Sequence, residues 1–100
     1  MNKEILDKII SILKEKSFEI KFECHIFAGK SHIRGIYVYD TIDKNAVKLL
    51  FDKDILKHFK IEKTLTWYLG ERKKIILLQF KDEIAIEIPE LESYTVNNFV

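Results

Sequence analysis

The chain has 100 residues, of which 47% are hydrophobic, and its formal net charge at pH 7 is +1. Residues 1–100 fit a single domain, and their hydrophobic content is enough for a core and too high for a disordered chain. A charge this close to zero disfavours a protein that binds the phosphates of duplex DNA. Since no apolar run approaches the ~20 residues of a membrane span, we expect no membrane partner.

Cys24 is the one cysteine of the chain, which excludes an internal disulfide and favours a reducing compartment. The first residues have an amphipathic pattern instead of the basic and then apolar order of a secretory signal. We therefore expect a cytoplasmic protein. The bias toward lysine and isoleucine is compatible with an AT-rich genome or a thermophilic source, viral or archaeal, and indicates nothing about activity.

The N-terminal part of the chain predicts a helix followed by a strand. Residues 3–16 place apolar side chains at three- and four-residue spacing, with Asn2 as a suitable N-cap. Residues 18–26 then alternate, apolar at even and polar at odd positions, which is typical of a strand with one buried face. Cys24 falls on the buried face of this strand, so we expect a core thiol.

A hairpin partner for this strand is predicted next. Residues 28–32 are rich in turn formers, and residues 33–42 return as a second strand. In that strand Tyr37 and Tyr39 lie on one face and Ile36 lies on the other. We expect the two tyrosines to face away from the core.

A second helix is predicted over residues 44–59, with Asp43 as its N-cap. The segment Asp52-Lys53-Asp54 lies in its middle. Aspartate favours helix caps over helix interiors, so this segment is expected to kink the helix or divide it in two.

Three further strands are predicted from alternating patterns, over residues 61–69, 74–80 and 84–88. A tight hairpin turn at 70–72 joins the first two, and a turn at 81–83 joins the last two. In the first of these strands Leu65 and Trp67 are expected to face the core, and Tyr68 the solvent.

The predicted order is α-β-β-α-β-β-β, which places the chain in the α+β class. The simplest arrangement is a two-layer α/β sandwich, with one mixed, mostly antiparallel five-stranded sheet and two helices on one face. The crossover through the second helix would make the strands before and after it parallel. Residues 89–100 form a C-terminal extension that we expect to pack on the domain or on a partner.

The predicted uncovered sheet face carries three tyrosines among charged residues. Tyrosine is enriched at protein interfaces, and it also has a high strand propensity, so the pattern fits a binding face or a face that only stabilises the sheet. The candidate binding residues on this face and on the neighbouring turns are Tyr37, Tyr39, Tyr68, Lys21, His25, Arg34, Arg72 and Lys73.

Single-stranded nucleic acid is the alternative partner for the same face. Tyr37, Tyr39 and Tyr68 would be stacking platforms for unpaired bases, with basic groups near them. The glutamates Glu19 and Glu23 share the face and would repel a phosphate backbone, which favours a protein partner.

A remote alternative is a magnesium-dependent nuclease. Glu19 and Lys21 match the Glu-x-Lys element of such enzymes, in which carboxylates hold the metal ion. A further carboxylate on a neighbouring strand is needed, and Asp40 is the nearest candidate. A three-residue match is common by chance in a chain with 33% charged residues.

The cysteine and the histidines are candidate zinc ligands by residue type, namely Cys24, His25, His32 and His58. Cys24 and His25 are neighbours on a strand and therefore point to opposite faces, so they cannot both serve one ion. We expect no catalytic residue, no cofactor and no metal.

The sequence therefore predicts a small non-enzymatic interaction protein that binds another macromolecule, in the first place a protein. An adaptor, an inhibitor of the immunity or antitoxin kind, and a virus-encoded inhibitor of a host enzyme all fit this description. A homodimer is a natural corollary, because an exposed edge strand is often closed by a two-fold axis.

Overall fold

The computed structural model describes residues 3–40, 42–69 and 73–91, and for residues 68, 69 and 73 it describes the backbone alone. The elements are α1 (Lys3–Glu15), β1 (Glu19–Phe27), β2 (Lys30–Tyr39), α2 (Lys44–Leu50), α3 (Lys53–Leu56), the 3₁₀ helix η1 (Ile61–Lys63), β3 (Leu65–Leu69) and β4 (Lys73–Glu87). The chain turns helical again over residues 88–91.

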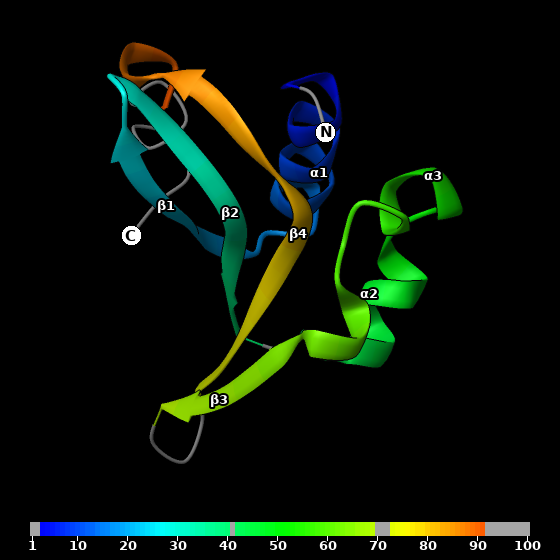
Figure 1. Ribbon diagram of the computed structural model, residues 1–100. Coiled ribbons are helices and arrows are strands. Elements are labelled where there is room, and N and C mark those ends of the chain that lie inside the picture. The colour runs from blue at the N-terminus through cyan, green and yellow to red at the C-terminus, as the bar shows by residue number, and fades with distance from the viewer. Residues whose placement is uncertain (1–2, 41, 70–72, 92–100) are drawn as a thin grey trace.

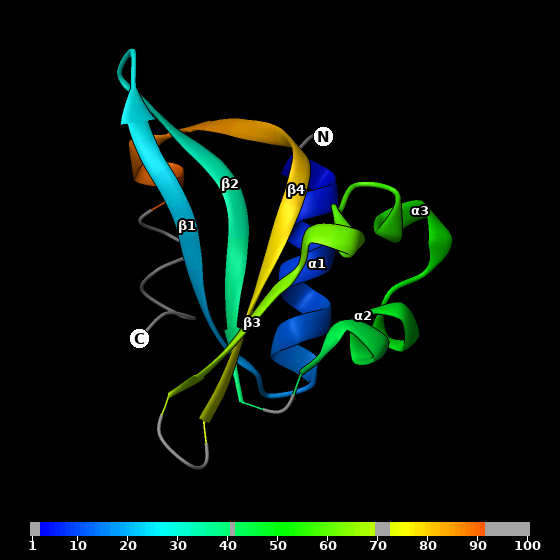
Figure 2. The same ribbon diagram turned by 60° about the horizontal axis from the view of Figure 1, so that its bottom comes forward.

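Four strands form one antiparallel sheet in the order β1-β2-β4-β3. Helix α1 lies on one side of this twisted sheet, and α2 and α3 lie beside it near β4 (Figure 1). The β3–β4 hairpin extends away from the helices at the bottom of both views (Figures 1 and 2). Among the described residues, every helix is too short or too polar to cross a lipid bilayer.

The structure is of the α+β class, but the predicted five-stranded sheet is wrong. The last two predicted strands, 74–80 and 84–88, are parts of the single strand β4. The segment 81–83 has one turn former, Asp82, and neither Gly nor Pro; its backbone continues in the same direction because Ile84 and Ile86 go on pairing with β2. The surplus residues are taken up by an irregularity, because Gln79 pairs with Gly35 and the next recorded pair is Ile84 with Ile33.

The predicted mixed sheet is also wrong. Strands β2 and β3 run in the same direction, as the crossover through the helices requires, but they do not pair with each other. Strand β4 lies between them and is antiparallel to both. Every pairing in the described sheet is therefore antiparallel.

Helix α1 confirms the prediction for residues 3–16. It ends in a Schellman motif, in which the Phe18 amide donates to Leu13 O at 3.0 Å and the Ser17 amide donates to Lys14 O at 2.8 Å. Ser17 has a φ of 61°, the left-handed conformation that this motif requires. The motif turns the chain directly into β1. The side chains that α1 buries are Leu6, Ile9, Ile10 and Leu13.

The second predicted helix is divided at Asp52, as its sequence indicates. Asp43 caps α2 by accepting a hydrogen bond from the Ala46 amide at 2.8 Å, and Asp52 caps α3 by accepting one from the Ile55 amide at 3.0 Å. A carboxylate at each N-cap satisfies amides that have no partner inside the helix.

The core lies between the helices and one face of the sheet. The helices supply the residues given above together with Val47 and Ile55, and Phe51 is added from the turn between α2 and α3. Strands β1, β2 and β4 supply alternate residues, except where their register is irregular. These sheet residues are Ile20, Phe22, Ile33, Ile36, Val38, Ile76, Leu78, Phe80, Ile84 and Ile86.

Cys24 packs against the edge of this core and is half-buried, so it is less enclosed than predicted. Partial burial, and then the charge of Glu23, raise the pKa of its thiol. The thiol is therefore protonated and poorly nucleophilic at neutral pH.

Candidate functional site

The sheet face turned away from α1, here called the outer face, carries the predicted binding residues. In the sheet register Tyr37 lies between Lys21 of β1 and Leu77 of β4, and Leu77 is opposite Leu65 of β3. The next row consists of Glu19, Tyr39, Ile75 and Trp67. Because cross-strand partners share a face, these two rows form one continuous surface.

One end of the outer face is apolar. We call it the aromatic end, and it consists of Tyr37, Tyr39, Leu65, Trp67, Ile75 and Leu77. Trp67 is 41% exposed and Leu65 is 49% exposed, although both belong to a regular strand. The rings of Tyr37 and Trp67 lie 6.2 Å apart at an angle of 42°. Ile75 and Leu77 are buried beside them and form an aliphatic floor.

Strand β3 presents the opposite face from the one predicted. Leu65 and Trp67 were expected to face the core, but their partners Leu77 and Ile75 place them on the outer face. Thr66 is the residue that shares a face with Ile76 and the core. The β3–β4 hairpin extends beyond the helices, so the alternation of β3 has no helix to pack against.

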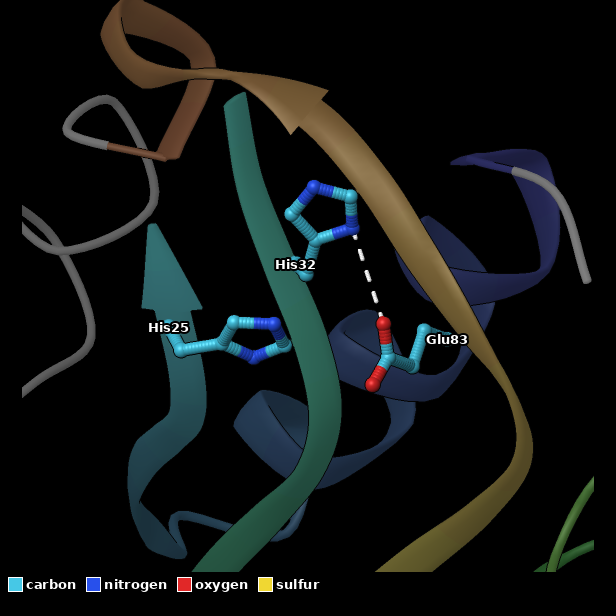
Figure 3. A group of neighbouring side chains, drawn as sticks. All are labelled: His25, His32 and Glu83. Carbon is cyan, nitrogen blue, oxygen red and sulfur yellow. Dashed lines mark ion pairs between the residues drawn. The ribbon is translucent and has the colours of Figure 1, made fainter. Parts of the chain in front are cut away.

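The other end of the outer face is polar, and we call it the histidine end. It consists of His25, His32, Arg34 and Glu83. His25 and His32 are cross-strand partners whose rings stack with centroids 5.1 Å apart. His32 Nδ1 lies 3.5 Å from Glu83 Oε2, across the gap between β2 and β4 (Figure 3).

Arg34 connects the members of the histidine end. Its Nε donates to His25 Nδ1 at 2.9 Å and lies 3.5 Å from Glu83 Oε1. Arg34 is the extra residue of a bulge, because Ile33 and Gly35 pair with neighbouring strands and Arg34 does not. A bulge re-aims a side chain, and here it brings the guanidinium over the histidines.

Two local features of the sequence set this arrangement. Ala28 and Gly29, with φ angles of 53° and 77°, make a two-residue turn that pairs Phe27 with Lys30 and therefore His25 with His32. Gly35 lets β2 and β4 approach closely, because a Cβ at this position would lie 2.5 Å from Leu78 O. Both features fix the register at the histidine end.

The structure divides the predicted site residues into two groups. Tyr37 and Tyr39 belong to the aromatic end, with Lys21 beside Tyr37 on β1, and His25 and Arg34 are together at the histidine end. Tyr68 follows Trp67 on β3, and its backbone partner on β4 is Lys74. The side chains of Tyr68 and Lys73 and the whole of Arg72 lie outside the described part of the structure.

Sequence reasoning missed Leu65, Trp67 and Glu83 as residues of the outer face, and it considered His32 as a zinc ligand without placing it beside His25. A signal for that position of His32 was present, because a two-residue turn at 28–29 pairs His32 with His25. Within the described ranges, His25, His32 and Glu83 form a group whose potential metal-ligand atoms all lie within 4.8 Å of one another. Glu19 of the nuclease hypothesis belongs to no such group in those ranges.

Comparisons with protein-family models, with curated proteins and with solved structures give no match to this chain.

Proposed function

We propose that the chain is a non-enzymatic interaction protein that binds another protein through the aromatic end of its outer face. The observation that carries this proposal is the exposure of Trp67 and Leu65 beside Tyr37, on the edge strand β3. Tryptophan and tyrosine are the residues that most often dominate the binding energy of protein interfaces. They offer large apolar contact areas at a low cost in conformational entropy.

The expected partner is a protein segment that places apolar side chains against Trp67 and Leu65, alongside β3. Ile75 and Leu77 form the floor of this surface, and apolar side chains of a partner would extend it. Strand β3 is also an edge of the described sheet, so an extended segment can add to it through backbone hydrogen bonds. Glu19, in the same row as Trp67, disfavours a phosphate backbone.

A capture experiment with matched variants tests this proposal. Immobilised wild type, Trp67→Ala and Leu49→Ala are exposed to an extract of the source cell, and each protein retained by the wild type is then purified and its affinity measured. Leu49 is the control because it is 89% exposed on α2, away from the sheet. We expect Trp67→Ala to weaken binding about 30-fold or more, the effect of a central interface residue, and Leu49→Ala to leave it unchanged. Equal affinities for the wild type and both variants would refute the proposal.

Two other occupants of the aromatic end give distinct outcomes. Trp67 is the single tryptophan of the chain, so its fluorescence reports on this surface alone. A thymidine oligonucleotide could quench the Trp67 fluorescence. Quenching that becomes weaker with added salt would assign the surface to single-stranded nucleic acid. A concentration-dependent shift in emission, with dimer mass in sedimentation velocity, would assign it to a second copy of the chain.

A further inference from the structure

We propose that the histidine end binds a divalent transition-metal ion of the zinc class through His25 Nδ1, His32 Nδ1 and the carboxylate of Glu83. Arg34 occupies the place of the ion when no metal is bound. This inference is independent of the proposed function, since its residues and its test are separate from the aromatic end.

The donor set fits this class of metal. Imidazole nitrogens are borderline ligands that suit Zn²⁺, Co²⁺, Ni²⁺ and Cu²⁺, and two imidazoles with one carboxylate form a known zinc ligand set, whereas Mg²⁺ and Ca²⁺ prefer oxygen alone. Tetrahedral Zn²⁺ with bonds of about 2.1 Å separates its ligand atoms by roughly 3.4 Å. The potential ligand atoms of His25, His32 and Glu83 already lie within 4.8 Å of one another. Reorientation of the two stacked rings and a shift of the Glu83 carboxylate would bring these atoms to that spacing, with a fourth position for water.

The hydrogen bonds of the two rings leave the required lone pairs in place. His32 Nε2 lies 3.0 Å from Phe27 O, and a carbonyl only accepts, so Nε2 carries a proton; in the neutral ring Nδ1, which faces Glu83 at 3.5 Å, is then the nitrogen with the lone pair that an ion would take. A backbone carbonyl that fixes the tautomer in this way is the usual outer support of a metal-binding histidine. At His25 the Arg34 Nε–H donates to Nδ1, so that nitrogen also carries a lone pair.

The guanidinium of Arg34 shows where this cluster of side chains accommodates a positive charge. Its Nε contacts His25 Nδ1 at 2.9 Å and lies 3.5 Å from Glu83 Oε1, so it satisfies two of the three proposed ligands at once. Its side chain is 49% exposed, which allows it to swing into solvent when an ion arrives. Metal and guanidinium therefore compete for the same two groups.

The three ligands come from three neighbouring strands, which hold them at fixed spacing. On β4, His32 has Ala85 as its register partner, two residues from Glu83. The bulge at Arg34 and the irregularity before Ile84 lie at this level of the sheet, and bulges are common beside functional sites.

Calorimetric titration of the untagged protein with zinc chloride tests the site. We expect one ion per chain, and His25→Ala or His32→Ala should weaken binding about tenfold or more, since even the loss of an outer support has this effect. The matched controls are His58→Gln and Cys24→Ser, because His58 lies beyond α3 and Cys24 faces the core. Unchanged affinity in both histidine variants, or loss in either control, would overturn the proposal.

Arg34→Met provides a test in the opposite direction. This variant removes the competing cation and keeps a side chain of similar length, so we expect zinc to bind about tenfold more tightly, as the loss of one charge-assisted hydrogen bond implies. Weaker binding would show that Arg34 helps to hold the ion, and it would refute the proposed competition between Arg34 and the ion.

Nitrogen-15 NMR of the wild type needs no variant. Zinc should shift the Nδ1 signals of His25 and His32 and leave those of His58 unchanged. Shifts at Nε2, or shifts at His58 instead, would refute the ligand assignment.

Discussion

The two ends of the outer face differ in how the backbone holds them. At the aromatic end, β2, β4 and β3 pair without interruption, and side chains from three strands form flat apolar rows. At the histidine end the register shifts on β1 against β2 and on β2 against β4, and the side chains form a compact polar cluster. Regular pairing thus produces a surface suited to broad contact, whereas irregular pairing concentrates chemical groups at one point.

The aromatic end also differs from the core, which lies on the opposite face of the same strands. Trp67 and Ile76 are close in the sheet, one on the outer face and the other in the core. If the aromatic end is a surface for a partner, its residues should contribute little to the free energy of unfolding of the isolated chain. Substitutions in the core should therefore destabilise the fold more than substitutions at the aromatic end.

Ile76→Ala should lower the free energy of unfolding by about 2–5 kcal/mol, because Ile76 is fully buried and its truncation leaves a cavity. Trp67→Ala should cost about 1 kcal/mol, through loss of the ring contact with Tyr37 and of cross-strand packing. Urea denaturation followed by far-ultraviolet circular dichroism measures both variants. Equal losses would mean that the aromatic end is part of the core.

Gly35→Ala should lower the free energy of unfolding by about 1–3 kcal/mol, since the new methyl group meets the backbone of β4 and forces the strands apart. Proton–nitrogen spectra should change most at His32 and Arg34, and least at the indole signal of Trp67. A change centred on Trp67 would contradict the independence of the two ends.

Ser31→Ala should raise the free energy of unfolding by about 1 kcal/mol. Ser31 lies behind the histidine end on the core face, fully buried, and its hydroxyl has no hydrogen-bond partner in the described structure. Removal of an unsatisfied polar group is favourable, and the melting temperature should rise by about 4–8 °C. A lower melting temperature would show that the hydroxyl is satisfied.

The smallest expected effect concerns the ion pair between Asp43, at the N-terminus of α2, and Lys74 of β4. Asp43 caps α2 and lies 3.6 Å from Lys74 Nζ at the start of β4. The hydrogen bond from the Ala46 amide, and then the charge of Lys74, hold the pKa of this carboxyl below its usual value of 3.8.

A lowered folded-state pKa means that ionised Asp43 stabilises the fold above pH 4 and that this contribution is lost as the pH falls further. Asp43→Asn keeps an oxygen at the N-cap and removes the charge. The wild type should therefore melt at a higher temperature than Asp43→Asn at pH 6, and the difference should shrink as the pH falls below 4. A constant difference across this range would show that the charge has no role.

The sequence predicted the local elements well because their signals are local. The stripe of residues 3–16 and the alternation of 18–26 depend on spacing alone, and the division at Asp52 depends on the capping preference of one side chain. The strand order and the strand count depend on contacts between distant residues. Lys81-Asp82-Glu83 has the polarity of a turn, and only pairing with β2 shows that the strand continues.

The candidate site was partly predictable for the same reason. Tyr37 and Tyr39 were placed on the outer face from their alternation with Ile36 and Val38. The outward position of Trp67 was not, because an apolar alternation does not indicate which face a helix covers. Glu83 joins His32 across β2 and β4, and no spacing within the sequence indicates a contact between residues so far apart.

Strand β4 has a consequence for the synthesis of the protein. It is an inner strand of the sheet, paired on both sides along part of its 15 residues, yet it is the last of the four strands to leave the ribosome. The β1–β2 hairpin and β3 emerge earlier and cannot be joined until β4 is available. Folding therefore waits for nearly the whole domain, and the nascent chain exposes two unpaired strand edges that a chaperone would shield.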